Sequence, residues 1–363
     1  MKKKVLFVLQ KISDGGAERV ATVLCNELCK MDLDVTLLVY FPTKGEYPVN
    51  SQIKKIYLKK TEPEYRSLSF FQKLKDIRDV LKKERADYFV PFLYFVGVHV
   101  QLASIGLHGK VIQTVRNDPK SVPQSRKERL IRDVIYCFMW KGFVQNKRQL
   151  EYFPSYIRKK MTILPNPVSE EFLKNNPTRE NNGLIVSVGR LNEQKNFEML
   201  IRVARILKCK NYRFQIEIYG EGSLRETLQK QIIEYKVEDC CKLCGRTEDV
   251  PAVLSKASVF VMTSSYEGMP NALMEAMASG LPCVSTNCPT GPNELIVDGV
   301  NGYLIEINDD EKCAQRIIQI LSDRDVSLSI GEHARQSIMG NYSPSVIAKR
   351  FREEVLMLSN RYS

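Results

Sequence analysis

The sequence has few histidines and no long apolar run, and each scarcity excludes a class of function. Three histidines occur among the 363 residues, and none forms a cluster with carboxylates, which argues against a metal centre. No apolar run approaches the roughly 18 residues that would span a bilayer. The Gly-x-Gly-x-x-Gly fingerprint of dinucleotide-binding enzymes is also missing, so a nicotinamide-dependent oxidoreductase is poorly supported.

The sequence also lacks the features of a secreted protein. The basic start, residues 1–4, leads directly into an apolar strand-like segment without the cleavage site of a signal peptide. We therefore expect a cytoplasmic protein whose ten cysteines are reduced thiols. The Cys241-x-x-Cys244 pair has no second pair and overlaps an expected strand, so we expect it to be structural.

The length and the pattern of apolar segments predict two α/β domains. The chain exceeds the roughly 250 to 300 residues at which one core stops growing. Short apolar strands alternate with helical segments, which is typical of parallel sheets wrapped by helices. The expected strands are 5–10, 35–40, 88–92, 111–114 and 142–145 in the first half, and 184–188, 215–219, 242–244, 259–262 and 282–285 in the second. Prolines and asparagines at 164–168 and 175–182 predict a linker, and therefore domains 1–168 and 182–342 followed by a last helix at about 343–358.

A single run, residues 266–277, indicates the chemistry best. It follows the apolar strand 259–262, and Pro270 suits the first position of a helix, so Glu267 is expected in the turn and Glu275 inside the helix. A helix that opens after a parallel strand offers free amides and a positive dipole end to a diphosphate. Two carboxylates beside such a site suit a ligand with several hydroxyls. Together these features predict a nucleotide-sugar site.

Glu267, seven intervening residues and Glu275 resemble the Glu-x7-Glu motif of retaining glycosyltransferases with the GT-B fold, the group 1 glycosyl transferases of bacterial capsule, O-antigen and glycan assembly. Similar blocks occur in the expected order at 14–18, 188–196 and 291–302. The resemblance implies two Rossmann-like, doubly wound domains that face each other across a cleft. It also implies that the C-terminal helix crosses back to the first domain, which would bind the acceptor, while the second would bind the donor.

The charged residues of these blocks suggest specific roles. Breaking the bond between sugar and diphosphate leaves negative charge, which Arg190 and Lys195 can stabilise without a metal. Glu275 would hold the ribose hydroxyls and Glu267 those of the donor sugar. The remaining predicted substrate-binding residues are Gly15, Gly16, Arg246, Thr247, Met269, Pro270, Asn271, Ala272 and Leu273. Two Asp-x-Asp triplets, at 32–34 and 323–325, are interpreted as solvated turns rather than metal ligands.

The loop 113–119 departs from the pattern of the resembled family, many members of which have a histidine there. We expect Arg116 to take over contacts to the sugar or phosphate. Asp118 is a candidate general base, although capping of the turn before Pro119 explains it equally well. Gly15 and Gly16 follow the first strand, where a close approach to the donor phosphates and a simple tight turn are both open.

Positive charge is concentrated in the first half of the chain. Residues 1–180 have 33 basic and 19 acidic side chains, a net +14, whereas residues 181–363 have 21 and 23, a net −2. Such a surface suits anionic lipid headgroups or a pyrophosphate-linked acceptor, with nucleic acid as the rival partner. The segments 70–83 and 126–141 combine apolar and basic residues at helical spacing. Either is able to lie on a membrane, or to be an ordinary amphipathic helix that covers a sheet.

The sequence thus predicts a retaining hexosyltransferase. It would move a hexose or N-acetylhexosamine from a nucleoside-diphosphate sugar, with UDP favoured, to a polyprenyl-diphosphate-linked or growing glycan, without a cofactor or metal. We expect it to be peripheral at the inner face of the cell membrane and to have no nucleic-acid partner. A sugar-nucleotide 2-epimerase of the same fold, or a non-catalytic protein that binds nucleotide sugars or nucleic acid, are the alternatives.

Overall fold

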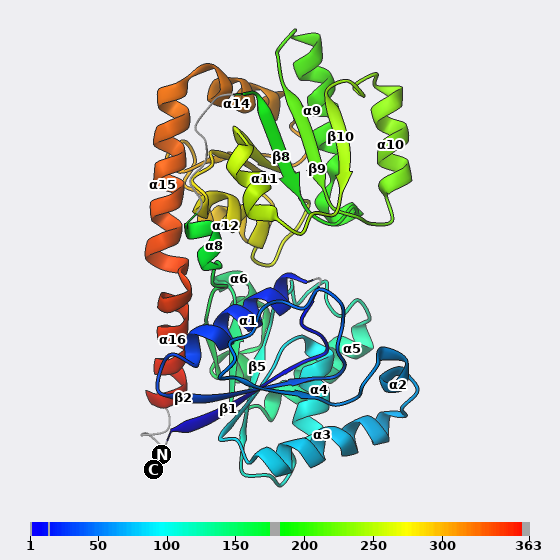
Figure 1. The fold of residues 1–363 in the computed structure, drawn as a ribbon, viewed down its shortest axis with the longest axis vertical. Helices are drawn as coiled ribbons and strands as arrows, with labels where there is room; N and C mark the ends of the chain where they lie inside the picture. The colour runs from blue at the N-terminus through cyan, green and yellow to red at the C-terminus, as the bar shows by residue number, and fades with distance from the viewer. Residues whose placement is uncertain (1, 14, 175–181, 358–363) are drawn as a thin grey trace. The chain divides into compact units, whose positions relative to one another are not determined.

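The computed structural model describes residues 2–13, 15–174 and 182–357, which form two compact units. Unit 1 comprises Met1–Pro167 and Pro344–Ser363, and unit 2 comprises Val168–Ser343 (Figure 1). The chain passes from one to the other beside the proline-rich segment 164–168. Asp14, the greater part of the expected linker at 175–181, and residue 358 of the expected last helix lie outside the described residues.

Unit 1 is built on a seven-stranded parallel sheet of order β3-β2-β1-β4-β5-β6-β7. Its strands are β1 (Lys3–Leu9), β2 (Leu33–Val39), β3 (Lys54–Tyr57), β4 (Tyr88–Pro91), β5 (Lys110–Thr114), β6 (Lys141–Val144) and β7 (Met161–Ile163). The apolar run 5–9 of β1 is buried on both faces, as expected for a central parallel strand. The strand order reverses between β1 and β4, and ligands bind at the carboxyl edge of such a switch point.

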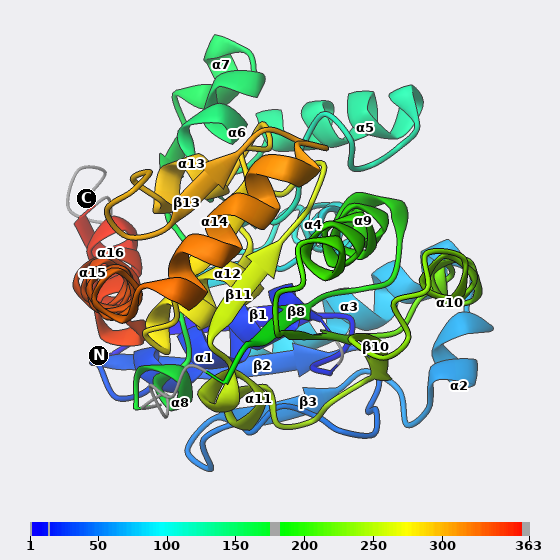
Figure 2. The same ribbon diagram turned by 90° about the horizontal axis from the view of Figure 1, so that it is seen from above.

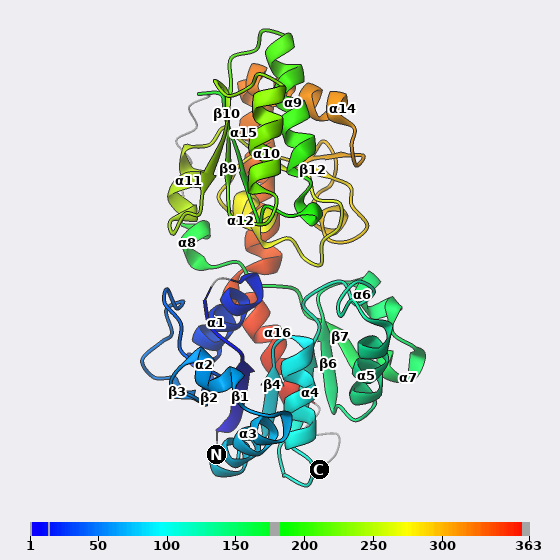
Figure 3. The same ribbon diagram turned by 90° about the vertical axis from the view of Figure 1, so that its right-hand side faces the viewer.

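Helices cover both faces of this sheet. They are α1 (Gly16–Leu28), α2 (Glu62–Arg66), α3 (Phe70–Glu84), α4 (Tyr94–Ala103), α5 (Arg126–Cys137), α6 (Lys147–Tyr152), α7 (Ser155–Arg158) and α16 (Pro344–Met357). On one face α1 packs against α16, which inserts Phe351 between Phe7 and Phe143. The other face is covered by α3 and α4, and α5 to α7 gather beside β6 and β7 (Figure 3).

Unit 2 has a six-stranded parallel sheet of order β10-β9-β8-β11-β12-β13. Its strands are β8 (Leu184–Val188), β9 (Gln215–Tyr219), β10 (Cys241–Gly245), β11 (Val259–Met262), β12 (Cys283–Thr286) and β13 (Tyr303–Ile305). The helical elements are α8 (Glu170–Leu173), η1 (Glu193–Lys195, a 3-10 turn), α9 (Phe197–Cys209), α10 (Arg225–Glu234), α11 (Val250–Lys256), α12 (Asn271–Ala278), α13 (Pro292–Leu295), α14 (Asp310–Ser322) and α15 (Arg324–Tyr342). Here the order reverses between β8 and β11.

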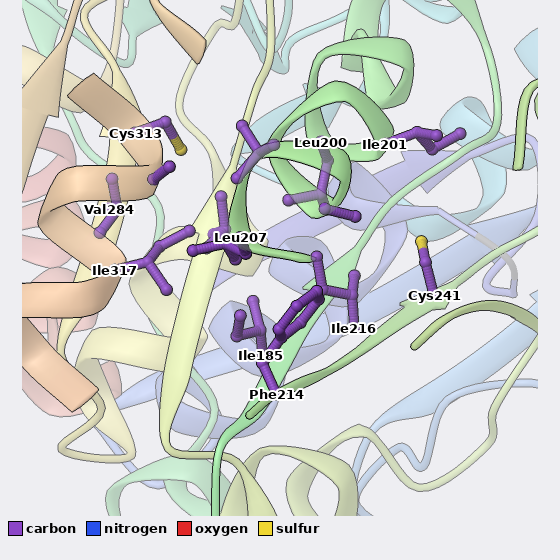
Figure 4. Packing of buried hydrophobic residues seen from close by; sticks show 14 of the residues in the cluster. Ile185, Leu200, Ile201, Leu207, Phe214, Ile216, Cys241, Val284, Cys313 and Ile317 are labelled. Atoms are coloured by element: carbon purple, nitrogen blue, oxygen red, sulfur yellow. The ribbon is translucent and has the colours of Figure 1, made fainter. Parts of the chain in front are cut away.

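The two faces of the second sheet have separate cores. Helix α9 packs between α10 and α14 on one face (Figure 2). Leu200 and Leu207 of α9 lie among Ile185, Ile216 and Ile317 there (Figure 4). On the other face α12 packs against α15 and buries its apolar side, including Leu273 and Met277. These two cores hold β8 and β11 rigidly, so the loops at their carboxyl ends have a fixed base.

Two parallel sheets wrapped by helices confirm the predicted α/β class, and every expected strand is present to within two residues. Strands β3, β7 and β13 were not predicted. Each is only three or four residues long, and β3 begins with two exposed lysines, so the sequence has no apolar run there. The last helix, predicted from residue 343, begins at Pro344 and packs with unit 1.

Candidate functional site

The candidate site in unit 2 lies at the carboxyl ends of β8 and β11. These strands pair directly, with Val259 opposite Ile185 and Phe260 opposite Val186. Lys195 ends the short turn η1 that follows β8, and Glu267 lies in the turn between β11 and α12. Residues 72 positions apart in the chain are thus adjacent at the topological switch point, where open α/β sheets bind ligands.

Glu267 is buried, and three neighbouring side chains contact its carboxylate. Lys195 Nζ lies 2.5 Å from Glu267 Oε1. The Ser264 hydroxyl donates to the same oxygen at 2.7 Å, and Gln194 Nε2 donates to Oε2 at 3.4 Å. The side chain of Glu267 is 7% exposed and that of Lys195 is 18% exposed, so the ion pair is largely shielded from water. A carboxylate and an ammonium group therefore meet in one site with weak dielectric screening.

Helix α12 opens beside this pair. Pro270 is the N-cap residue and Asn271 is the first residue of the helix, so the prediction that Pro270 begins the helix is wrong by one position. Proline has no amide hydrogen, so the first amides that can face a ligand are those from Asn271 onward. The glycine at 291, with φ +95°, packs against this turn, because a Cβ there would lie 2.6 Å from Pro270 Cδ.

The other predicted residues of the helix start have different exposures. Met269, Asn271 and Ala272 are half-buried, whereas Leu273 is fully buried and belongs to the core under α12. Glu275 lies one turn into α12 and is 7% exposed. The sequence predicts Glu267 in the turn and Glu275 inside the helix, and the structure has them there; both side chains are buried.

Arg190, Arg246 and Thr247 also follow strands of the second sheet. Arg190 is exposed in the loop after β8. Arg246 is exposed and Thr247 is half-buried after β10, the strand at the edge of the sheet, two places away from β8. The Thr247 hydroxyl accepts a hydrogen bond from the Asp249 amide at 3.1 Å, which shapes the turn before α11. The roles assigned to these three residues stay predictions.

In unit 1, Arg116 belongs to a buried polar cluster after β5. Its Nη1 donates to Asn166 Oδ1 at 2.9 Å, and its guanidinium lies 4.7 Å from the ring centroid of Phe92. Gln145 donates to the same Asn166 oxygen, also at 2.9 Å. The Nε atom of Arg116 is buried and has no hydrogen-bond partner among the described residues. Burial lowers the pKa of Arg116.

The sequence interpretation missed Asn166 and Gln145 as parts of this cluster. Asn166 lies between two prolines and was assigned to the linker, while Gln145 was included only as the end of a strand. Gln145 follows β6, the neighbour of β5, and Asn166 comes after β7, the next strand, so the strand order brings both to the same edge of the sheet as Arg116. For Gln145, the available signal was a polar residue directly after the buried strand β6.

Asp118 and the glycine loop have local structural roles. Both oxygens of Asp118 accept hydrogen bonds from the following turn, one from the Lys120 amide at 3.1 Å and one from the Ser121 hydroxyl at 2.7 Å. These contacts correspond to the alternative in which Asp118 caps the turn. The general-base role stays a prediction. Gly15 is the N-cap of α1, where a Cβ would collide with the Glu18 carboxylate, and Gly16 begins the helix.

Neither Asp-x-Asp triplet is part of a cluster of metal-ligating side chains. Asp32 forms a surface ion pair with Lys2, and Asp323 caps α15 by accepting from the Val326 amide at 3.1 Å. Within residues 2–13, 15–174 and 182–357, no three His, Cys, Asp or Glu side chains lie close enough to hold an ion. Burial raises the pKa of the Cys241 thiol to about 12, which keeps it protonated at neutral pH.

Comparisons with known proteins find glycosyltransferases. Residues 168–337, nearly all of unit 2, match the family model "Glycosyl transferases group 1". Over 92% of its length the chain is 26% identical to an alpha-1,4-N-acetyl-D-galactosaminyltransferase of Campylobacter jejuni, 93% of which is covered. The name of that enzyme includes a diNAcBac-PP-undecaprenol-linked acceptor. Over 96% of its length the chain is 25% identical to the amylovoran biosynthesis glycosyltransferase AmsD of Erwinia amylovora, 99% of which is covered.

Solved structures share the fold of the whole chain. HepE of Anabaena, in complex with UDP and glucose, superposes with a TM-score of 0.80 at 16% identity, over 97% of this chain and 99% of that one. A sucrose-phosphate synthase of Thermosynechococcus elongatus gives a TM-score of 0.81 at 16% identity, over 99% and 100%. The chain is therefore an enzyme of the GT-B fold, and its residues 168–337 match the group 1 glycosyl transferases.

Proposed function

We propose that this enzyme moves a hexose or N-acetylhexosamine from a nucleoside-diphosphate sugar to a lipid-linked or growing glycan, in the assembly of a surface polysaccharide such as a capsule or O-antigen. The observation that supports it best is the contact of Lys195 with Glu267 beside the opening of α12. One acceptor-only carboxylate, one cation and the amides of a helix's opening turn are what a sugar diphosphate requires.

The leaving diphosphate is the centre of the mechanism. As the bond to the anomeric carbon breaks, negative charge grows on the bridging oxygen. Lys195, Arg190 and the amides from Asn271 onward would receive that charge, and Glu267 would hold the sugar hydroxyls. Glu275 would bind the ribose. Because these groups are positioned before the reaction, they need little rearrangement in the transition state.

We further propose that the anomeric configuration is retained. Glu267 is already engaged by Lys195 and Ser264 through Oε1, so it suits binding of hydroxyls better than attack on carbon. Departure of the diphosphate and attack by the acceptor would then occur on one face through an oxocarbenium-like state. The expected product has the same anomeric configuration as the donor.

UDP as the nucleotide and a lipid-linked acceptor are supported by the similar proteins. HepE holds UDP and glucose, and the C. jejuni enzyme is named for an undecaprenol-linked acceptor. Unit 2 would bind the donor and unit 1 the acceptor. In unit 1 the buried Arg116 has no carboxylate within ion-pair distance among the described residues, so an anionic group of a substrate suits it as a partner.

Helix α5 is the surface that we propose for membrane contact. It buries Arg132 together with Ile135 and Tyr136, and unlike an ordinary covering helix it also exposes large apolar residues. Arg132 is 1% exposed and donates to Pro119 O at 2.7 Å and Val122 O at 2.9 Å. The exposed apolar surface of α5, called the α5 face below, consists of Leu130, Ile131, Val134 and Phe138.

The charge near the α5 face suits an anionic leaflet. Arg126 and Lys127 are exposed at the start of the same helix, and each basic residue near such a surface adds about 1 kcal/mol of attraction. Helix α3 is the other candidate. It buries Ile77 and Leu81 against the sheet, and its exposed large apolar side chains are Phe70 and Phe71 at its start. None of the helices in the described parts of the chain is long and apolar enough to cross a bilayer. Peripheral binding at the inner face of the cell membrane is the corresponding location.

A panel of nucleotide sugars tests the reaction. The enzyme is incubated with each UDP-sugar, with and without a bacterial membrane lipid extract as acceptor, and release of UDP and the fate of the sugar are followed. We expect one hexose or N-acetylhexosamine donor to yield a lipid-extractable glycan only when the extract is present. Conversion of a UDP-sugar into its C2 epimer without acceptor would instead identify an epimerase. Nuclear magnetic resonance of the product linkage reports retention or inversion.

A further inference from the structure

We propose that Ser264 and Gln194 are positioning residues that fix the Glu267 carboxylate so that its Oε2 atom faces the donor sugar. This inference deepens the proposed function and rests on it. Neither residue touches the proposed reacting atoms; both act through Glu267.

Ser264 fixes one oxygen of the carboxylate. It is fully buried, and its hydroxyl donates to Glu267 Oε1 at 2.7 Å. Its own carbonyl accepts a 2.6 Å hydrogen bond from the buried hydroxyl of Thr286 at the end of β12. The serine is thus anchored to the neighbouring strand, and a buried hydroxyl aimed at a carboxylate has a defined direction.

Gln194 connects the two loops that form the site. Its side-chain amide donates to Tyr266 O at 2.9 Å and to Glu267 Oε2 at 3.4 Å. Its main-chain carbonyl accepts from the Ser265 main-chain amide at 2.8 Å. The next carbonyl, that of Lys195, accepts from the Thr263 hydroxyl at 2.9 Å. The loop after β8 and the loop after β11 therefore move as one body, which keeps Lys195 at Glu267.

The two oxygens of Glu267 consequently differ. Oε1 accepts two short contacts, from Lys195 and Ser264, whereas Oε2 accepts one long contact from Gln194 among the residues described by the structure. A carboxylate oxygen has room for two donors, so Oε2 retains capacity for a hydroxyl of the sugar. If Ser264 loses its hydroxyl, Oε1 keeps only its contact with Lys195, so the orientation of the carboxylate toward the sugar is less well defined.

The test compares substitutions at Ser264 with a buried serine elsewhere in unit 2. Ser264→Ala removes the hydroxyl, Ser264→Thr keeps it, and Ser187→Ala removes a hydroxyl that is equally buried but donates to Val261 O at 2.6 Å. For each variant we measure kcat/KM with the UDP-sugar that the wild type turns over, and the inhibition constant of UDP, which has no sugar. Gln194→Met, on a half-buried loop, is a second probe that leaves the core intact.

Loss of one hydrogen bond to a charged group changes a rate or binding constant by about ten- to hundred-fold. Ser264→Ala should lower kcat/KM by that factor and leave UDP inhibition within about threefold, with Ser264→Thr recovering most of the loss. Gln194→Met should also lower kcat/KM and leave UDP inhibition nearly unchanged. Its fall in kcat/KM should be smaller, because the contact of Gln194 with Glu267 is longer. Ser187→Ala should change neither.

Equal losses in kcat/KM and UDP inhibition, an effect of Ser187→Ala as large as that of Ser264→Ala, or no effect at Ser264 would each overturn the inference. Glu267→Gln separates this failure from that of the proposed function. If Glu267→Gln abolishes turnover while Ser264→Ala is harmless, only the positioning role is wrong. If Glu267→Gln retains wild-type turnover, the proposed function fails and the positioning role with it.

Discussion

The contact between Lys195 and Glu267 is the feature most open to a quantitative test. Lys195→Met removes the ammonium group but keeps the length of the side chain, and Glu267→Gln removes the negative charge with almost no change in shape. The double variant removes both charges. Comparison of the four proteins isolates the interaction from the other contacts of each residue.

The structure indicates the size of the effect on stability. Breaking a fully buried ion pair by removing one partner costs about 3–5 kcal/mol. Here the lysine side chain is 18% exposed, and Ser264 and Gln194 still donate to the carboxylate, so Lys195→Met should lower the free energy of unfolding by about 2–3 kcal/mol. For a unit of this size the corresponding fall in Tm is about 5–10 °C.

The double variant decides whether the charges interact. Once the carboxylate is neutral, the loss of the ammonium group matters less, so the double variant should be more stable than the sum of the single effects by about 1–2 kcal/mol. Denaturation in urea at pH 7, followed by circular dichroism, measures all four proteins. Single and double effects that add within about 0.3 kcal/mol would show that no ion pair forms in solution.

The same four proteins test the mechanism. Removing a cation that stabilises the leaving diphosphate should lower kcat by about 100- to 1000-fold. Because both residues act on one transition state, the double variant should be little slower than the slower single variant. If Lys195→Met turned over the donor within about threefold of the wild type, the proposed role of its charge would be refuted.

Three further outcomes are expected. Glu275→Gln should weaken UDP binding in calorimetry by about tenfold or more because the ribose loses a charged acceptor, and unchanged affinity would contradict its assignment. Leu130→Ser combined with Phe138→Ser should abolish co-sedimentation with vesicles that contain anionic lipid, whereas Phe71→Ser on α3 should not; equal binding by all three proteins would exclude the α5 face. Burial lowers the pKa of His99 from 6.5 to about 4, so the unfolded chain binds more protons between these values and stability falls as the pH falls through that window. The free energy of unfolding, measured in urea, should therefore fall between pH 7 and pH 5 by about 2 kcal/mol less in His99→Gln than in the wild type. Equal decreases in the two proteins would contradict the lowered pKa.

Much of the site was accessible from residue order because its chemistry is local. The buried strand β11, the turn and α12 are consecutive in the chain, so the positions of Glu267 and Glu275 followed from hydrophobic pattern alone. The one-residue error at Pro270 reflects the similar suitability of proline for the N-cap and the first helical turn. The glycine pair after the first strand likewise located Gly15 at the start of α1.

The amphipathic segments show the opposite situation. Periodicity in 126–141 identifies a helix with an apolar side, and it leaves open whether this side covers the sheet or lies on a membrane. The structure buries Arg132 together with Ile135 and Tyr136, because the carbonyls of Pro119 and Val122 accept hydrogen bonds from the guanidinium, and it leaves Leu130 and Phe138 exposed. The sequence of a helix does not show which face will be buried when a turn elsewhere in the chain supplies hydrogen-bond acceptors for a charged side chain.

The order of apolar, glycine, proline and charged residues was thus sufficient for the fold class, the strand-turn-helix that bears both glutamates, and the excess of positive charge in the first half. Tertiary structure alone brought Lys195, Gln194 and Ser264 onto Glu267, and Asn166 and Gln145 onto Arg116. The physical reason is that parallel strands far apart in the chain become neighbours through their crossover helices. Strand order, which depends on the packing of both sheet faces, therefore decides which loops meet at the carboxyl edge.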